Sequence, residues 1–256
     1  MQRILSKARL PAITQSTSKK QCLSSNYLIG IAMFYMMFPM VTSLLVYKII
    51  SIGPFMSAAG IFITPLIYCL NNVTTEVYGY EVSRNMMWWF IAASVTYVTL
   101  CSLCIKLPSP DNFMNQGAYD LILGSMPRIC IAGVLGNLCA LSFNSYFLSK
   151  LKIKMQGRAY WLRSILSTSP GEVIYNLVAY PIMHIGKTPP EQLIRIFISV
   201  SLFKIFVTIF FTPLEWFFAH YLKKKEGINT FDYGVNYNIF RIGITKEKPT
   251  LKVVNP

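Results

Sequence analysis

Long stretches without any charged side chain dominate the pattern of apolar and polar positions along the chain. Four of these stretches are continuous, at residues 21–47, 49–75, 85–105 and 129–149. A helix that crosses the hydrocarbon layer of a membrane needs about 20 predominantly apolar residues. The stretches therefore predict membrane-spanning helices at about 27–47, 54–72, 86–106 and 128–149.

Two further apolar stretches contain isolated charged side chains. The stretch at about 164–185 is interrupted by Glu172, and the stretch at about 193–221 by Lys204 and Glu215. A transmembrane β-barrel would instead show segments of about 10 residues that alternate apolar and polar. We therefore expect an all-α integral membrane protein with six transmembrane helices, which form one transporter domain over residues 26–222.

The composition supports a membrane protein over a soluble one. Hydrophobic residues make up 54% of the 256 positions and charged residues only 13%, whereas about 25% are charged in a typical soluble domain. The net charge of +14 would suggest a nucleic-acid partner on a soluble chain. The distribution of these charges leads to a different interpretation.

The Lys and Arg residues lie mainly on one side of the predicted spans. Eighteen of them fall on the side that holds both termini, and only Lys48, Lys106 and Lys187 fall on the other side. Short loops rich in Lys and Arg tend to stay in the cytoplasm. We therefore expect both termini to be cytoplasmic, with a basic tail at 1–25 and a polar tail at 223–256.

This pattern favours a multi-pass protein of a bacterial inner (plasma) membrane. The first apolar run is long and lacks a small-residue cleavage site, so we expect no cleavable signal peptide. The first 25 residues are basic, Ser-rich and free of acids, as in mitochondrial transit peptides. An organellar membrane is therefore the less favoured alternative.

Residue types that carry catalysis or bind metals are scarce. Cys101 and Cys104 form a single CxxC pair without a second pair or a nearby His, which favours a packing role. The two histidines, His184 and His220, form no HExxH motif, and no Gly-rich phosphate loop is present. We expect no enzyme activity, no cofactor and no metal site.

Glu172 is the leading functional candidate among the charges within the spans. Placing an ionisable group in hydrocarbon costs a few kcal/mol, so such residues usually face a cavity or a partner. Glu172 follows Pro170 and Gly171, which loosen a helix, and broken helices often hold the substrate sites of transporters. A structural ion pair or hydrogen bond, for example with Lys204, is the alternative interpretation.

The sixth predicted span carries a polar stripe. A helix turns by about 100° per residue, which places the stripe within an arc of about 80°. Its members are Ser201, Lys204, Thr208, Thr212 and Glu215. Hydroxyl groups alone can bond back to helix carbonyls, but this does not account for Lys204. The stripe predicts a face that points into the bundle or into a cavity.

The fourth predicted span has two distinct faces. Ala132, Gly136 and Ala140 follow one another at a spacing of four, which lets another helix approach closely. Asn137 and Asn144 share a different face. One of them could line a cavity, and an interhelical hydrogen bond is an equally good interpretation.

The segment from Asn71 to Tyr80 is rich in polar side chains and is followed by Arg84. It is either a cytoplasmic loop, with Glu76 and Arg84 two helical turns apart, or a segment that packs back into the bundle. In the second case it supplies Glu76 and the asparagines as hydrogen-bonding groups. The chemistry of the residues leaves both interpretations open.

Three motifs in this order carry a family resemblance: Asn72-x-x-x-Glu-Val-Tyr-Gly79, Arg163-Ser-Ile-Leu-Ser-Thr-Ser-Pro-Gly-Glu172, and Phe203-Lys204 with Thr212-Pro213. On a six-span chain they resemble the queuosine precursor transporter family, known as the VUT or YhhQ family, across about residues 27–225. The resemblance implies uptake of a 7-deazaguanine base (preQ0, preQ1 or queuine) across the inner membrane for tRNA modification. By position, it implicates Glu76, Tyr78, Gly79, Arg84, Arg163, Ser167, Gly171 and Lys204.

The chain departs from the family pattern at two places. Asn72 stands where the family usually has an acid, and another acid is expected near Tyr175 or Asn176. These replacements bear on the choice of substrate and on any proton-coupling group. The fold implied by the resemblance is unaffected.

A physical hypothesis for the site follows from the shape of such a base. A planar neutral base stacks on Tyr or Phe rings, and a carboxylate accepts two hydrogens from its guanine-like edge in a bidentate geometry. Glu172 or Glu76 is the candidate acceptor, and Lys204 holds Glu172 ionised in the empty site. The full candidate set for substrate binding or coupling is Glu172, Lys204, Glu76, Asn72, Tyr78, Arg84, Arg163, Ser167, Asn137 and Asn176.

Two other functions compete with a transporter that acts alone. One is the substrate-binding subunit of an energy-coupling-factor vitamin importer, which would need partner ATPases. The other is a small membrane enzyme acting on a lipid or isoprenoid, which would need paired acids or a metal cluster. The expected partners are a small-molecule substrate and the lipid bilayer, with no nucleic acid. The sequence also allows a homo-oligomer.

Overall fold

The structure, a computed structural model, describes residues 26–46, 48–52, 55–110, 112–186 and 189–243. The predicted basic tail at 1–25, Lys187 and the end of the chain from 244 lie outside these ranges. The described helices are α2 (Asn26–Leu45), α3 (Thr64–Tyr78), α4 (Tyr80–Cys104), α5 (Gln116–Leu123), α6 (Met126–Lys154), α7 (Tyr160–His184) and α8 (Pro190–Glu226). The predicted all-α class is confirmed apart from one short hairpin.

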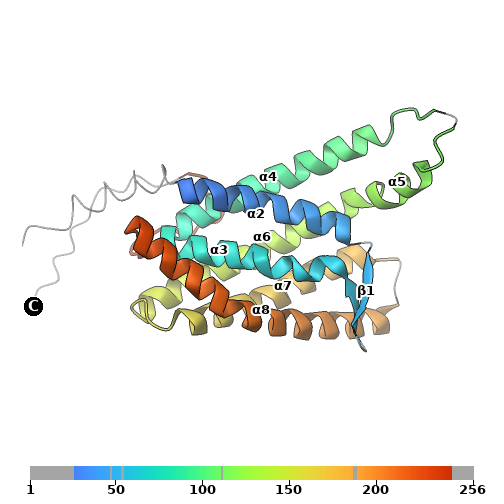
Figure 1. Cartoon of the computed structure of the whole chain (residues 1–256). Coiled ribbons are helices and arrows are strands. Elements are labelled where there is room, and N and C mark those ends of the chain that lie inside the picture. The colour runs from blue at the N-terminus through green and yellow to red at the C-terminus, as the bar shows by residue number, and fades with distance from the viewer. Residues whose placement is uncertain (1–25, 47, 53–54, 111, 187–188, 244–256) are drawn as a thin grey trace, which may run out of the picture.

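The long helices lie side by side in an elongated bundle (Figure 1). α6 packs against α7, α7 against α8, and α3 against both α6 and α8. The first residue of α2 and the last residue of α8 lie at the same end of the bundle, and the hairpin lies at the opposite end (Figure 1). This arrangement places α3, α6, α7 and α8 around a common interior.

Four helical segments are long and apolar enough to cross a membrane: α2, α4, the region 116–154 that includes α5 and α6, and α8. α3 has only 15 residues, and α7 carries many buried polar side chains. The apolar segments make the chain a multi-pass membrane protein by length and composition.

The prediction of a second helix from residue 54 is wrong. Ile49–Ile52 and Phe55–Ala58 form the antiparallel hairpin β1–β2, and a 3-10 helix follows at Ala59–Phe62. β-branched residues, of which β1 has three, favour strands. α3 begins only at Thr64, with Pro65 in its first turn, where proline is well tolerated because the N–H that it lacks has no helical partner.

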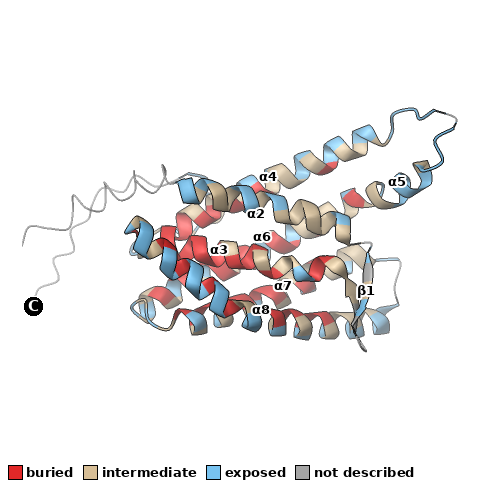
Figure 2. Cartoon of the chain, viewed as in Figure 1, coloured by how far each residue is buried: buried red, intermediate tan, exposed pale blue. Residues whose placement is uncertain are grey.

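The buried residues, red in Figure 2, line the interior of the bundle, and many of them are polar. Large apolar side chains are exposed on the outer faces, for example Trp89, Leu100, Phe206 and Phe210. The buried polar side chains include Asn72, Glu76, Asn144, Arg163, Glu172, Asn176, Lys204 and Glu215. Apolar side chains toward lipid and ionisable groups toward the interior are the expected arrangement for a membrane bundle.

The small-residue face of α6 contacts α7 as predicted. Ala132 and Ala140 are fully buried. A Cβ atom on Gly136 would lie 3.0 Å from side-chain atoms of both Ala179 and Tyr175. This close approach positions Tyr175, whose ring contributes to the site described below.

The polar stripe on α8 is also confirmed as an inward face. All five of its members are buried: Ser201, Lys204, Thr208, Thr212 and Glu215. Because α8 packs against α3 and α7, these side chains meet the polar side chains of those two helices.

Candidate functional site

Glu172 of α7 and Lys204 of α8 form a buried ion pair. The Lys204 Nζ atom lies 3.1 Å from a carboxylate oxygen of Glu172 and donates to Oδ1 of Asn176 at 2.9 Å. Asn176 in turn donates to Ser201 Oγ at 2.8 Å. The ion pair that the sequence suggested as an alternative interpretation of Glu172 is therefore present.

Lys204, the cation of this pair, lines a cavity of about 460 Å³, here named the α7–α8 cavity. Lys204, Tyr175 and Tyr180 line it on the side of α7 and α8, and Thr64 and Gly60 line it near the hairpin. The Lys204 Nζ atom lies 4.4 Å from the centre of the Tyr175 ring, in the range of a cation–π contact. Volumes of about 300–1,000 Å³ are typical of small-molecule sites.

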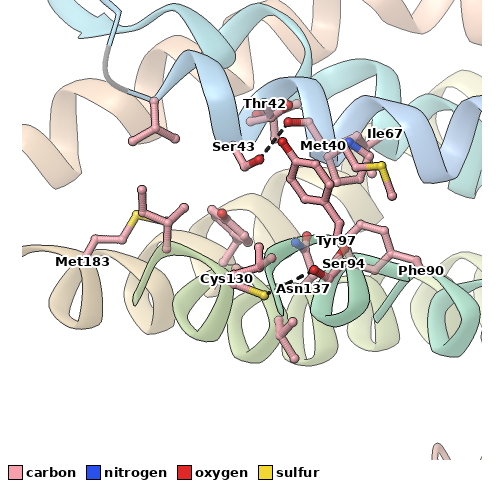
Figure 3. A pocket seen from close by; sticks show the side chains of 18 residues that line it. Met40, Thr42, Ser43, Ile67, Phe90, Ser94, Tyr97, Cys130, Asn137 and Met183 are labelled. Atoms are coloured by element: carbon pink, nitrogen blue, oxygen red, sulfur yellow. Dashed lines mark hydrogen bonds between the residues drawn. The ribbon is translucent and has the colours of Figure 1, made fainter. Parts of the chain in front are cut away.

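A smaller cavity of about 80 Å³ lies between α2, α4, α6 and α7 (Figure 3). Asn137, Tyr97 and Met40 surround this space in Figure 3. Thr64 and Tyr175 line both cavities, so the two spaces are neighbours. Asn137 of α6 therefore fits the first of the two interpretations, because it lines a cavity.

The other asparagine of α6 makes the interhelical hydrogen bond. Asn144 donates to Oδ1 of Asn72 on α3 at 2.6 Å. Asn72 donates to the hydroxyls of Thr168 at 2.7 Å and Ser164 at 3.3 Å, and the Ser164 hydroxyl donates to Glu215 of α8. A polar layer therefore joins four helices beyond the ion pair.

Glu76 lies at the centre of a cluster of three cations. The Arg163 guanidinium donates to both of its carboxylate oxygens, at 2.7 and 3.0 Å, in the fork geometry that makes such pairs strong. Lys223 lies 2.5 Å from one of these oxygens and Lys152 3.8 Å from it. The segment that ends at Tyr80 thus packs into the bundle, as the second of its two interpretations proposed.

Arg84 does not pair with Glu76 but binds the C-terminal tail. Its guanidinium donates to the backbone oxygens of Asn236, Asn238 and Gly243 at 2.9–3.1 Å. Trp88 donates to the backbone oxygen of Ile239 at 2.8 Å. The described part of the tail therefore folds back onto α4.

Gly79 and Asp232 form the second anchor of the tail. Both carboxylate oxygens of Asp232 accept from the backbone N–H of Tyr80 at 3.1 Å, and one accepts from Ser149 at 2.6 Å. Gly79 has φ +93°, and a Cβ atom there would lie 2.7 Å from Asp232. Burial raises the pKa of Asp232 above its usual value, against the opposing effect of these hydrogen bonds.

The remaining candidates lie away from the cavities. Ser167 is fully buried and donates to the backbone oxygen of Ser164. Tyr78 packs in an apolar cluster with Cys69, Val73 and Leu222. The sequence reasoning missed several residues of the site, listed here: Tyr175 and Tyr180 at the cavity, Lys152 and Lys223 around Glu76, and Asp232 in the tail. Among the described residues, no group of three His, Cys, Asp or Glu side chains could hold a metal ion.

A family model described as "Putative vitamin uptake transporter" matches residues 58–218. The chain belongs to this transporter family. The matched region runs from the end of the hairpin to the last third of α8 and contains Glu76, Glu172, Lys204 and Glu215. The family resemblance drawn from the three motifs is therefore confirmed.

A curated protein of narrower description is similar to the chain. The "Probable queuosine precursor transporter" of Bacillus subtilis (strain 168) is 22% identical to the chain over 151 residues. The match covers 59% of this chain and 66% of that relative, just under two thirds of its length. No solved structure matches the chain.

Proposed function

We propose that this transporter imports a queuosine precursor, a 7-deazaguanine base, through the α7–α8 cavity. The observation that carries the proposal is the Glu172–Lys204 ion pair, whose cation lines a cavity large enough for a small molecule. Membership of the transporter family and the name of the Bacillus subtilis relative support it.

The ion pair offers complementary groups to a guanine-like edge. Such an edge presents two N–H donors beside a carbonyl acceptor. In the described part of the chain, Oε1 of Glu172 has no hydrogen-bond partner, so this carboxylate can still accept hydrogen bonds. Lys204 contacts Glu172 and lines the cavity, and its ammonium group would turn to donate to the carbonyl oxygen. The rings of Tyr175 and Tyr180 provide surfaces on which the base would stack.

Glu76, the other candidate acceptor, suits a structural role better. Three cations surround its carboxylate, whereas Glu172 pairs with the single cation Lys204, which lines the α7–α8 cavity. A carboxylate already bound to Arg163 at both oxygens would have to give up these bonds to accept from a substrate. We therefore assign base recognition to Glu172.

We further propose that six helices cross the bacterial inner membrane with both termini in the cytoplasm. In this arrangement α3 and α7 are the two polar spans, enclosed by the four apolar ones. The start of α2 and the end of α8 lie at one end of the bundle (Figure 1). This placement and the bias of Lys and Arg toward that side support the orientation. Labelling of single cysteines introduced at Ser57 and Lys225 from either side of the membrane tests it.

The function is tested by complementation of tRNA queuosine in a bacterium that lacks both synthesis and its own transporter. Each base is fed separately at low concentration, in a strain without energy-coupling-factor subunits. We expect rescue by the wild type and by the control variant Lys225→Gln. Lys225 is an exposed lysine of α8, the helix that also carries Lys204. Rescue in this strain also excludes the importer-subunit alternative.

Glu172→Gln and Lys204→Met are the informative variants. Loss of a hydrogen bond to a charged group costs about 1.5–3 kcal/mol, so we expect the apparent affinity to fall by about 10- to 100-fold. Uptake measured against substrate concentration gives this value directly. An unchanged affinity in Glu172→Gln contradicts the assigned acceptor, and a failure of all three bases to rescue the wild type contradicts the substrate class.

A further inference from the structure

Glu215 is a buried carboxyl group without a cation beside it. Its side chain is 4% exposed, and it accepts a hydrogen bond from the Ser164 hydroxyl. Arg163 precedes Ser164 in the chain, but its guanidinium binds Glu76 and not Glu215. Among the described residues, no ion pair includes Glu215.

The titratable groups around Glu215 give its charge no compensation. α8 packs against α3 and α7. The groups on these helices that interact electrostatically with Glu215 are Cys69 and Glu76 on α3 and Tyr160 on α7, each of which is neutral or negative. An ionised carboxylate in such surroundings pays a desolvation cost of several kcal/mol that no cation offsets, and the hydrogen bond from Ser164 offsets only part of it. These surroundings favour the neutral, protonated form of Glu215.

A row of polar side chains runs from Glu215 toward the ion pair. Ser164 bonds to Glu215 and to Asn72, and Asn72 bonds to Thr168. Thr168 and Glu172 are four residues apart on α7, so they lie on the same face about one helical turn apart. Hydroxyl groups can both donate and accept, so the hydroxyls of this row can stay paired in either protonation state of Glu215.

Two further buried hydroxyl groups lie on α8 and α3. Thr208 lies four residues after Lys204, and in the described part of the chain its buried hydroxyl has no hydrogen-bond partner. The buried Tyr68 hydroxyl of α3, which interacts electrostatically with Glu172, also has none. These groups lie on the helices that carry Glu172, Lys204 and Glu215, and their hydrogen-bonding capacity is unused.

We propose that Glu215 is the proton-binding residue of this transporter and that its protonation is coupled to the binding of substrate at Glu172 and Lys204. The proton adds to a carboxylate oxygen of Glu215 and leaves from the same oxygen, and no other bond is made or broken. The proposal rests on the proposed function for the identity of the substrate. The location of the proton site rests on the burial and contacts of Glu215.

The test uses the purified full chain in liposomes with radiolabelled preQ0. Two assays are compared: exchange of substrate at equal pH on both sides, and accumulation driven by a more acidic exterior. One pH unit corresponds to about a tenfold concentration ratio for a single coupled proton. We expect the wild type to accumulate substrate up to about tenfold per pH unit and Glu215→Gln to exchange it without accumulating it.

Two further variants control the assay. Glu191→Gln changes an exposed carboxylate at the start of the same helix and should accumulate substrate like the wild type. Glu215→Asp keeps an acid and should restore accumulation. Accumulation by Glu215→Gln, its loss of exchange, or a wild type that exchanges substrate without responding to the pH gradient would each overturn the proposal.

A measurement without substrate separates this proposal from the proposed function. Infrared spectroscopy detects the carbonyl stretch of a protonated carboxylic acid directly. We expect such a band at neutral pH in the wild type and in Glu172→Gln, and its loss in Glu215→Gln. If preQ0 is not transported but this band is present, the substrate is wrong and the proton site stands. Absence of the band in the wild type overturns the proton site.

Discussion

The guanidinium of Arg163 on α7 holds the carboxylate of Glu76 on α3 with two hydrogen bonds, 2.7 and 3.0 Å long. Both side chains are fully buried. Lys223 joins the same carboxylate from α8, so one acidic side chain connects three helices at the end of the bundle where the chain enters α2 and leaves α8.

Arg163→Ala should destabilise the protein severely. Breaking a buried ion pair by removing one partner costs about 3–5 kcal/mol. Arg163→Lys should recover only part of this loss, because a lysine lacks the planar fork that binds both oxygens. Chemical unfolding in mixed micelles measures the effect. Arg158→Ala, at an exposed arginine of the preceding loop, should behave like the wild type, and equal stability of the two alanine variants would contradict the assigned role.

Gly79→Ala should disrupt the junction between α3 and α4 and the docking of the tail. The backbone of Gly79, at φ +93° and ψ 170°, lies in a region that is essentially restricted to glycine, at a cost of about 1–3 kcal/mol for other residues. The new methyl group would also meet Asp232. Gly30→Ala is the matched control, since it meets nothing within 4 Å and lies inside α2. It should stabilise the helix by up to about 1 kcal/mol.

The docking of the tail through Asp232 should depend on pH. Because burial raises the pKa of Asp232 in the docked tail, the docked state binds the proton more tightly than the undocked one. The stability that Asp232 adds to the docked tail is fully present below the ordinary pKa of an aspartate. This stability is lost as the pH rises through the raised pKa of Asp232. Hydrogen exchange of residues 228–243 at several pH values measures docking. Asp232→Asn should remove this pH dependence, and an unchanged dependence would contradict the assignment.

The sequence predicts the inward faces well because a charge inside an apolar run has few physical interpretations. Glu172, Lys204 and Glu215 were found in this way, and all three are buried. The Glu76–Arg163 pair cannot be found in the same way, because its members are 87 positions apart and the sequence pattern places Arg163 in a basic loop between two predicted spans. Positive charge in such a loop indicates topology, and the contact depends on tertiary packing.

Two other features were beyond the sequence pattern for different reasons. A continuous apolar run does not distinguish a helix from paired strands, so the hairpin β1–β2 was hidden within residues 49–75. The docked tail is polar, and its anchors, Arg84 and Asp232, bind mainly backbone groups. Because every residue has a backbone carbonyl group, a contact to backbone does not depend on the type of the residue that is contacted.

The stability of the Glu172–Lys204 pair provides a final prediction, which is independent of transport. Lys204→Met leaves the Glu172 carboxylate buried without its cation and should cost about 3–5 kcal/mol. The double variant Glu172→Gln with Lys204→Met leaves neither charge of this pair, so it should cost less than the sum of the single variants. Unfolding of all four proteins in mixed micelles completes the cycle.

The control cycle pairs Glu191→Gln with Lys225→Met, two exposed residues near opposite ends of α8. Distant sites usually add within about 0.3–0.5 kcal/mol. Additive costs at Glu172 and Lys204 would show that the two side chains do not stabilise each other, and the proposed site would then lose the pairing that holds its acceptor ionised. A strong coupling would instead explain why an acid and a base persist in the buried interior of the bundle, since each makes the other's burial tolerable.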